Sequence, residues 1–353
     1  MFYAGAMLTL ASCSKSNNGS SNTHQKQAYV TTIAGDGHNG YKDDNGTAAE
    51  FNAPAGITLD GQGNLFVADE RNNVIRMISP NGTVTTYAGN GTVGWVDGTA
   101  AASEFWSPEG VALDASGNVY VTDLTNNAIR KVTTSGNVST IAGHTEGYID
   151  GGGGNAEFFY PFGIVMAPSG NLVVADSYNH RIRQVTTGGS VSTLAGSGPT
   201  GPGNGGYADG PENAALFNSP YGVAVDAQGN IYVADQNNNC IRLLSQGTVS
   251  TVAGSGSTGL QDGPAQTAEF AAPEGVAIDQ SGNIFVADAG SNAIREIANG
   301  QVITIAGSSF SGYANGIGTA ARFNHPVGIV VDPDGNLLIS DQGNSVIRKI
   351  TFK

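Results

Sequence analysis

The chain has 353 residues, of which 52 are glycine and 12% are charged, and its formal net charge is −14. Proteins neutralise phosphates with clustered lysine and arginine, so this charge excludes nucleic acid as a partner. Glycine spread between short β-branched runs, with no long amphipathic helical segment, predicts an all-β protein with many turns.

The first element in the chain is a short apolar leader. Residues 1–12 are mostly apolar or small, and Leu10-Ala11-Ser12-Cys13 resembles the lipobox of bacterial lipoproteins, in which the cysteine becomes lipidated. The resemblance implies a signal at 1–13, lipidation of Cys13, a flexible polar tether at 14–29 and a lipid-anchored protein of the bacterial cell envelope, periplasmic or surface-exposed. The lipid anchor is then the only membrane contact expected. No lysine or arginine precedes the apolar run, which is consistent with a native start upstream of Met1.

Six similar units of about 53 residues follow the leader. Three residue types return in register: proline (Pro54, Pro108, Pro161, Pro220, Pro273, Pro326), aspartate (Asp69, Asp123, Asp176, Asp235, Asp288, Asp341) and arginine (Arg76, Arg130, Arg183, Arg242, Arg295, Arg348). In the first unit, the runs at 56–59, 64–69, 73–78 and 84–89 predict four short strands, with Asp-x-x-Gly-Asn as a tight turn between the first two. Four-stranded units repeated around a ring are the blades of a β-propeller.

The two ends of the repeat region predict how the ring closes. The sixth unit stops at Lys353, after its third strand, and lacks the Val-x-Thr-x-Ala-Gly segment, which stands instead at the N-terminus as Val30–Gly35. We therefore predict that residues 30–353 form a six-bladed β-propeller of four-stranded antiparallel blades. The N-terminal strand is expected to complete the last blade and so to protect its edge.

The repeated segments resemble NHL repeats. The resemblance rests on the Pro-x-Gly-Ile-x-Val-Asp and Gly-Asn-Leu-Tyr-Val-Ala-Asp pieces and on Asn179-His180-Arg181-Ile182-Arg183, and it covers all six units. It implies the propeller fold but leaves function open, because the family includes binding scaffolds, sensor domains and a few enzymes. The units exceed the usual family length by an insert before each Phe-x-x-Pro, which carries an aromatic-x-Asp-Gly signature.

Residues present in every unit are expected to serve the scaffold. The recurring aspartate and arginine predict a structural ion pair in each blade, and Asp60, Asp114, Asp226, Asp279 and Asp332 predict tight turns. The Asp-Gly pairs of the inserts also predict turns, with calcium as the alternative if enough oxygen ligands converge. His38, His144, His180 and His325 occupy different offsets, so a shared zinc site is not expected. Cys240 is expected to be a small buried hydrophobe.

Function is expected where the units differ. The position after the recurring proline varies most, and we expect a ligand site at the channel mouth formed by Glu109, Glu274, Trp106, Tyr160, Phe162, Tyr221, Arg322 and His325. Aromatic faces and carboxylates suit a sugar or a cationic ligand. Packing between blades is the alternative role of these side chains.

No catalytic motif is evident. We therefore favour a non-enzymatic binding propeller that recognises a carbohydrate, peptide or envelope protein on its insert-loop face and uses no cofactor. The alternative is a metal-dependent lyase or lactonase-type enzyme, with calcium or another metal at the channel mouth. A third possibility is a structural envelope protein whose propeller mediates assembly.

Overall fold

The structure is a computed structural model that describes Met1 and residues 27–353. Cys13, and with it nearly all of the predicted leader and tether, lies outside the described residues. In the part of the chain that the structure describes, no helix is long and apolar enough to cross a membrane.

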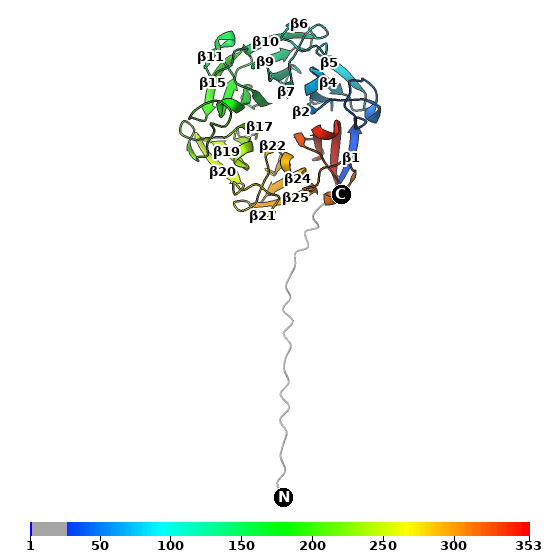
Figure 1. Ribbon diagram of the computed structural model, residues 1–353, viewed down its shortest axis with the longest axis vertical. Coiled ribbons are helices and arrows are strands. Elements are labelled where there is room, and N and C mark those ends of the chain that lie inside the picture. The colour runs from blue at the N-terminus through cyan, green and yellow to red at the C-terminus, as the bar shows by residue number, and fades with distance from the viewer. Residues whose placement is uncertain (2–26) are drawn as a thin grey trace.

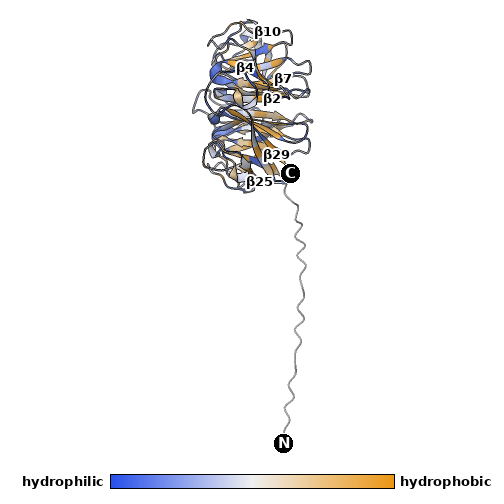
Figure 2. Ribbon diagram, turned by 90° about the vertical axis from the view of Figure 1, so that its right-hand side faces the viewer, coloured by the Kyte–Doolittle hydropathy of each residue, from blue (hydrophilic) through white to orange (hydrophobic). Residues whose placement is uncertain are grey.

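Six antiparallel sheets surround a central axis like the blades of a propeller (Figure 1). This confirms the predicted all-β, six-bladed fold. In the side view the blades form a disc in which the apolar residues concentrate in the strands (Figure 2).

Each blade contains four main strands, which follow one another from the axis outward. Blade 1 consists of β2 (Pro54–Leu59), β3 (Leu65–Asp69), β4 (Val74–Ile78) and β5 (Val84–Ala88). Blade 2 consists of β7 (Pro108–Leu113), β8 (Val119–Asp123), β9 (Ala128–Val132) and β10 (Asn137–Gly143). Blade 3 consists of β12 (Pro161–Met166), β13 (Leu172–Asp176), β14 (Arg181–Val185) and β15 (Ser190–Ala195).

The other three blades repeat this order. Blade 4 consists of β17 (Pro220–Val225), β18 (Ile231–Asp235), β19 (Cys240–Ser245) and β20 (Thr248–Ala253). Blade 5 consists of β22 (Pro273–Ile278), β23 (Ile284–Asp288), β24 (Ala293–Ala298) and β25 (Gln301–Gly307). Blade 6 consists of β27 (Pro326–Val331), β28 (Leu337–Asp341), β29 (Val346–Phe352) and β1 (Ala28–Ala34).

Five blades carry an additional outermost strand that the sequence did not predict. These two-residue strands are β6 (Gly98–Thr99), β11 (Gly151–Gly152), β16 (Gly210–Pro211), β21 (Gly263–Pro264) and β26 (Gly316–Ile317). Each belongs to the insert that precedes its blade in the chain, and it pairs with the fourth strand of that following blade. The inserts are therefore part of the blades, and the expectation of four strands per blade was incomplete.

Short 3₁₀ turns connect several of these elements. Those that follow the second strand of a blade are η2 (Glu70–Asn72), η4 (Ser177–Asn179), η5 (Gln236–Asn238), η6 (Ala289–Ser291) and η8 (Gln342–Asn344). Those within inserts are η1 (Gly46–Ala48), η3 (Gly153–Asn155) and η7 (Gly318–Ala320).

The N-terminal strand closes the ring as predicted. β1 lies antiparallel to β29, with Tyr29 opposite Thr351 and Thr31 opposite Lys349. The backbones of Gln27 and Lys353 exchange hydrogen bonds of 2.9 and 3.1 Å, so both ends of the propeller meet in one blade.

The hydrophobic core is divided among the six interfaces between neighbouring blades. Between blades 1 and 2, for example, Phe66 and Ile75 pack with Phe105 and Val111. Each interface joins two β-sheets face to face, which is how a sheet with two apolar faces avoids water.

The inner strands approach one another closely because glycine follows the recurring proline by two positions. A Cβ atom on Gly163 would lie 2.4 Å from the carbonyl oxygen of Tyr221 in the next blade, and one on Gly328 would lie 2.5 Å from that of Ala55. Glycine thereby brings the residue just before it, at the variable position, to the rim of the channel in each blade.

Candidate ligand site at the channel mouth

The arginine repeated in every blade is a structural residue. In blade 2, the buried guanidinium of Arg130 donates hydrogen bonds of 2.6 Å to Asp123 and 2.8 Å to Asp97, and it lies 4.9 Å from the ring centroid of Phe105. The predicted Asp–Arg ion pair is confirmed in all six blades.

The aspartates of the inserts do more than form turns. Asp97 accepts from Arg130 and also from the backbone N–H of Thr140, and five blades share this arrangement through Asp43, Asp97, Asp150, Asp209 and Asp262. Blade 6 has Asn315 instead, which accepts from Arg348 at 3.0 Å. Because each of these carboxylates forms an ion pair with an arginine, the expectation that they only form turns was incomplete. The turn role predicted for Asp60 and its equivalents is confirmed.

The four histidines of the insert face have separate partners. His38 contacts Asp36 and His144 stacks on Trp95. His180 Nδ1 accepts a hydrogen bond from the backbone N–H of Ser219, and its Nε2 lies 2.9 Å from the Gly201 carbonyl oxygen. In blades 1, 2, 4 and 5 an asparagine side chain accepts the equivalent bond from the backbone N–H of the next blade. Across the described residues, no group of three or more His, Cys, Asp or Glu is arranged to hold a metal ion.

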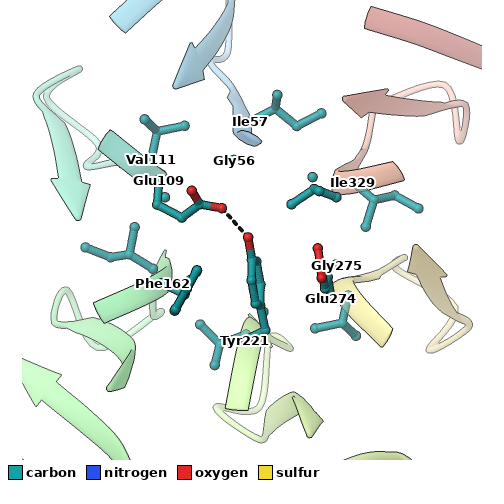
Figure 3. Close-up of a pocket in the computed structure, with 17 residues that line it drawn as sticks. Gly56, Ile57, Glu109, Val111, Phe162, Tyr221, Glu274, Gly275 and Ile329 are labelled. Atoms are coloured by element: carbon teal, nitrogen blue, oxygen red, sulfur yellow. Dashed lines mark hydrogen bonds between the residues drawn. The ribbon is translucent and has the colours of Figure 1, made fainter. Parts of the chain in front are cut away.

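The central channel has a cavity at one end, where the inner strands begin (Figure 3). About 450 Å³ of empty space extends up to its open mouth. Four of the predicted site residues, Glu109, Phe162, Tyr221 and Glu274, line this cavity. They come from four consecutive blades, 2 to 5, and occupy the position after the recurring proline in each.

Tyr221 contacts both Glu109 and Phe162 in the cavity. Its hydroxyl donates a hydrogen bond to Glu109 across the channel (Figure 3). Its ring lies 4.3 Å from that of Phe162, centroid to centroid. The pair presents aromatic surface next to a carboxyl group.

Glu274 faces Glu109 from the opposite side of the channel, and its side chain is almost completely buried. Its Oε1 accepts a 2.7 Å hydrogen bond from Gln236, whereas Oε2 has no hydrogen-bond partner among the described residues. His325 Nε2 lies 3.3 Å from that oxygen, close enough for an ion pair but not aligned for a hydrogen bond.

A third carboxylate was missed in the sequence. Glu70 begins η2 and accepts a 3.2 Å hydrogen bond from Gln342. Gln236, Gln342 and Glu70 share one repeat position, the residue after the recurring aspartate, which also varies among the units as Leu124, Ser177 and Ala289. The same comparison of units that singled out Glu109 would have found this position.

Burial and repulsion between neighbouring carboxylates raise the pKa values of Glu109 and Glu70. Desolvation raises the pKa of Glu109 well above its usual range, and the charges of Glu70 and Glu274 act in the same direction, against the hydrogen bond from Tyr221. Burial likewise raises the pKa of Glu70. The pKa of Tyr221 is raised by burial and then by the charge of Glu109, so its hydroxyl remains a donor. The contact with Glu274 raises the pKa of His325.

Trp106, Tyr160 and Arg322 do not line the cavity. Trp106 is exposed on the same face of blade 2, and Tyr160 packs with Phe159 and Tyr178 on blade 3. Arg322 lies in an insert, where it donates to Ser308 and to the Thr319 carbonyl. Of the eight predicted residues, four line the cavity, and a fifth, His325, contacts the cavity residue Glu274.

The channel beyond the mouth is apolar. Ile57, Val111, Ile164, Val223, Val276 and Ile329, one from each inner strand, line both this cavity and the space at the other end of the channel. The acidic and aromatic side chains are therefore at one mouth, on the side where the inserts and the 3₁₀ turns lie.

These features define a closed six-bladed propeller with an acidic, partly aromatic pocket at one end of its channel. The model of the NHL repeat matches residues 105–131, 158–185, 217–242, 270–297 and 323–350, once in each of blades 2 to 6. This chain belongs to the family of NHL-repeat proteins.

Two relatives show how far the similarity extends. The chain is 32% identical over 286 residues to Protein SUPPRESSOR OF QUENCHING 1, chloroplastic, of Arabidopsis thaliana, which covers 76% of this chain and 27% of the relative. It is 29% identical over 350 residues to NHL repeat-containing protein 2 of Bos taurus, covering 85% and 46%. The chain spans less than half the length of either relative.

Solved structures share the fold at lower identity. An auxiliary nutrient binding protein from Bacteroides thetaiotaomicron has a TM-score of 0.67 at 18% identity, covering 93% of this chain and 77% of that one. Virginiamycin B lyase from Staphylococcus aureus has a TM-score of 0.54 at 16% identity, covering 92% and 98%. Both a binding protein and an enzyme are thus similar to this chain in fold.

Proposed function

We propose that this protein is a binding propeller that takes its ligand at the channel mouth. The observation that carries the proposal is the cavity itself, which is lined by polar and aromatic side chains at the one repeat position where the six blades differ most. A rigid scaffold that presents variable residues around a concave site is the usual arrangement of a ligand-binding propeller. The fold shared with a nutrient binding protein supports the same class of function.

The partner that we propose is a carbohydrate or peptide, or a protein that inserts such a group into the mouth. We also propose that the chain is held at a bacterial envelope through a lipid on Cys13. The proposed location rests on the lipobox resemblance at Leu10–Cys13.

A binding screen tests the proposed function. The purified chain is exposed to glycan and peptide libraries, and each hit is measured again with Tyr221→Ala, which removes one wall of the cavity. We expect at least a tenfold loss of affinity for true ligands. The matched control is Tyr148→Ala, at an exposed tyrosine of an insert. Hits that bind both variants equally well would place the binding surface elsewhere and contradict the proposal.

An enzyme of the lyase or lactonase type is the second candidate. The specific observation in its favour is Glu109, a buried carboxyl whose raised pKa suits a general acid. The metal that this alternative was expected to need is testable by metal analysis of protein purified without chelator. Turnover of a lactone or ester that is lost in Glu109→Gln would favour the enzyme over the binding protein.

A further inference from the structure

The channel mouth concentrates negative charge. Glu70, Glu109 and Glu274 act on one another there, and among the described residues the cationic groups that act on them are His325 and Arg71. His325 is charged only when protonated. At neutral pH the mouth therefore has more acidic groups than cationic groups.

One of these acidic groups is buried without its full set of partners. Glu274 is 3% exposed and lines the cavity. Its Oε2 has no hydrogen-bond partner among the described residues, and its ionic contact among them is with His325, at 3.3 Å, which is itself about half exposed. Proteins rarely leave a buried carboxylate oxygen unpaired, because its desolvation is costly unless a donor or a positive charge is supplied. A ligand in the cavity is in a position to supply both.

On the basis of the proposed function, we propose that the ligand carries a protonated amino group, which binds between Glu109 and Glu274 while its carbon skeleton lies against Phe162 and Tyr221. An ammonium group offers up to three N–H donors and a positive charge. Aromatic faces attract such a cation in addition to covering apolar carbon. The tilted Phe162–Tyr221 pair stands between the two carboxyl groups along the rim.

The same residues disfavour other ligand classes. An anion would be repelled by those of the three acidic side chains that are ionised. Calcium needs six to eight converging oxygen atoms, and the described acidic residues are not arranged around one metal position. A neutral polyol supplies no positive charge to Glu274, whose ionic contact among the described residues is with His325. The cavity is small and open at its mouth, so it accommodates an amino group and the carbon atoms next to it rather than an entire large ligand.

The proposed binding mode is sensitive to pH. Glu109 is acted on by Glu70 from η2, Tyr221 from β17 and Glu274 from β22, and Glu274 in turn contacts His325 from the segment before β27. Its raised pKa means that it binds a proton in the empty site more readily than an ordinary glutamate does. A cation that requires the ionised form displaces this proton, so affinity increases with pH until Glu109 is ionised. Loss of charge from His325 acts in the same direction.

Matched pairs of probes test the proposal with the full chain. Calorimetry at pH 7.5 compares benzylamine with benzyl alcohol and glucosamine with glucose, so that each pair differs in whether an amine replaces a hydroxyl. Calcium chloride is a fifth probe. We expect at least one amine to bind at least tenfold more tightly than its neutral counterpart, and its affinity to fall between pH 7.5 and pH 5.5. The pair that responds distinguishes an apolar amine from an amino sugar.

Two isosteric variants identify the site. Glu274→Gln and Glu109→Gln are each expected to weaken amine binding at least tenfold, and Glu109→Gln is also expected to reduce the pH dependence. Glu212→Gln, at an exposed carboxylate of an insert, is the control and should leave affinity unchanged. A thermal melt shows that each variant is folded.

Each other outcome overturns the inference. Neutral probes that bind as tightly as the amines would contradict it while leaving the binding propeller intact. Calcium binding that is lost in Glu274→Gln would assign the carboxylates to a metal. If no amine binds at millimolar concentration, or if the amines bind Glu274→Gln and Glu109→Gln unchanged, the ammonium site is excluded. The library screen on Tyr221→Ala decides the proposed function independently.

Discussion

At the scale of residues, the recurring arginine shows how one side chain unites a blade. Arg130 connects the second strand, through Asp123, to the insert, through Asp97, and its flat face covers Phe105. A planar group with several fixed donors suits this role better than lysine would. The insert is therefore anchored to the blade by charge as well as by the short outer strand.

The two aspartates that bind this arginine are expected to differ in their effect on stability. Asp123 is fully buried, so Asp123→Asn breaks a buried ion pair and should lower the free energy of unfolding by about 3–5 kcal/mol. Asp97 is about half exposed, and blade 6 already has an asparagine there, so Asp97→Asn should cost about 0–1 kcal/mol. Urea denaturation of both variants measures the difference. Equal losses would contradict the separate roles of the two carboxylates.

At the scale of elements, the inner strands both close the channel and present the candidate site. The variable residue and the glycine after it occupy the same two positions in every blade, so a side chain at the rim can change while the backbone contact remains. This separation explains how a highly repetitive scaffold carries a pocket that is not repetitive. Ala55 and Val327 occupy the position where other blades have Glu109 or Tyr221.

The close approach of the inner strands predicts a strong effect of a single methyl group. In Gly163→Ala, the new Cβ would lie 2.4 Å from the Tyr221 carbonyl oxygen, so blades 3 and 4 must separate. We expect a loss of about 1–3 kcal/mol in the free energy of unfolding, as for other overpacked sites. The control is Gly154→Ala, where no atom lies within 4 Å of the added Cβ. A melting temperature for Gly163→Ala equal to that of the control would show that the ring can expand.

Repetition is also what made the elements predictable. The six-fold register of proline, aspartate and arginine identified the main strands and the closure by β1, because each unit repeats the same pattern. The short outermost strands, such as β6 and β16, were missed, since a Gly-Thr or Gly-Pro pair has no strand pattern of its own. Variation at one repeat position indicated four cavity-lining residues, Glu109, Phe162, Tyr221 and Glu274. Trp106 and Arg322 vary as well, but the direction of a side chain in a loop depends on contacts that sequence spacing does not specify.

At the scale of the whole molecule, the channel is asymmetric. Its waist is apolar in all six blades, and the acidic and aromatic side chains that line the channel lie at one mouth. Residues of all six blades line this cavity, so the affinity of the proposed ligand is expected to depend on the ring being closed. Closure in turn depends on one strand, β1, which is supplied by the opposite end of the chain.

This dependence predicts the effect of removing β1. A chain that begins at Asp36 exposes the edge of β29, along which Tyr29, Val30 and Thr31 otherwise pair, and it removes the buried Val30 and Ala34 from the core. An unpaired edge strand of this length recruits other chains, so we expect loss of the sharp unfolding transition and concentration-dependent association. A chain that begins at Gln27 keeps β1 and should retain the parent's association state and melting temperature. Sedimentation and calorimetry of the two truncations measure both effects, and adding a synthetic peptide of residues 27–35 should restore the transition in the shorter chain. If the chain that begins at Asp36 associates and melts like the longer one, five complete blades and an open sixth hold the ring without the strand that closes it.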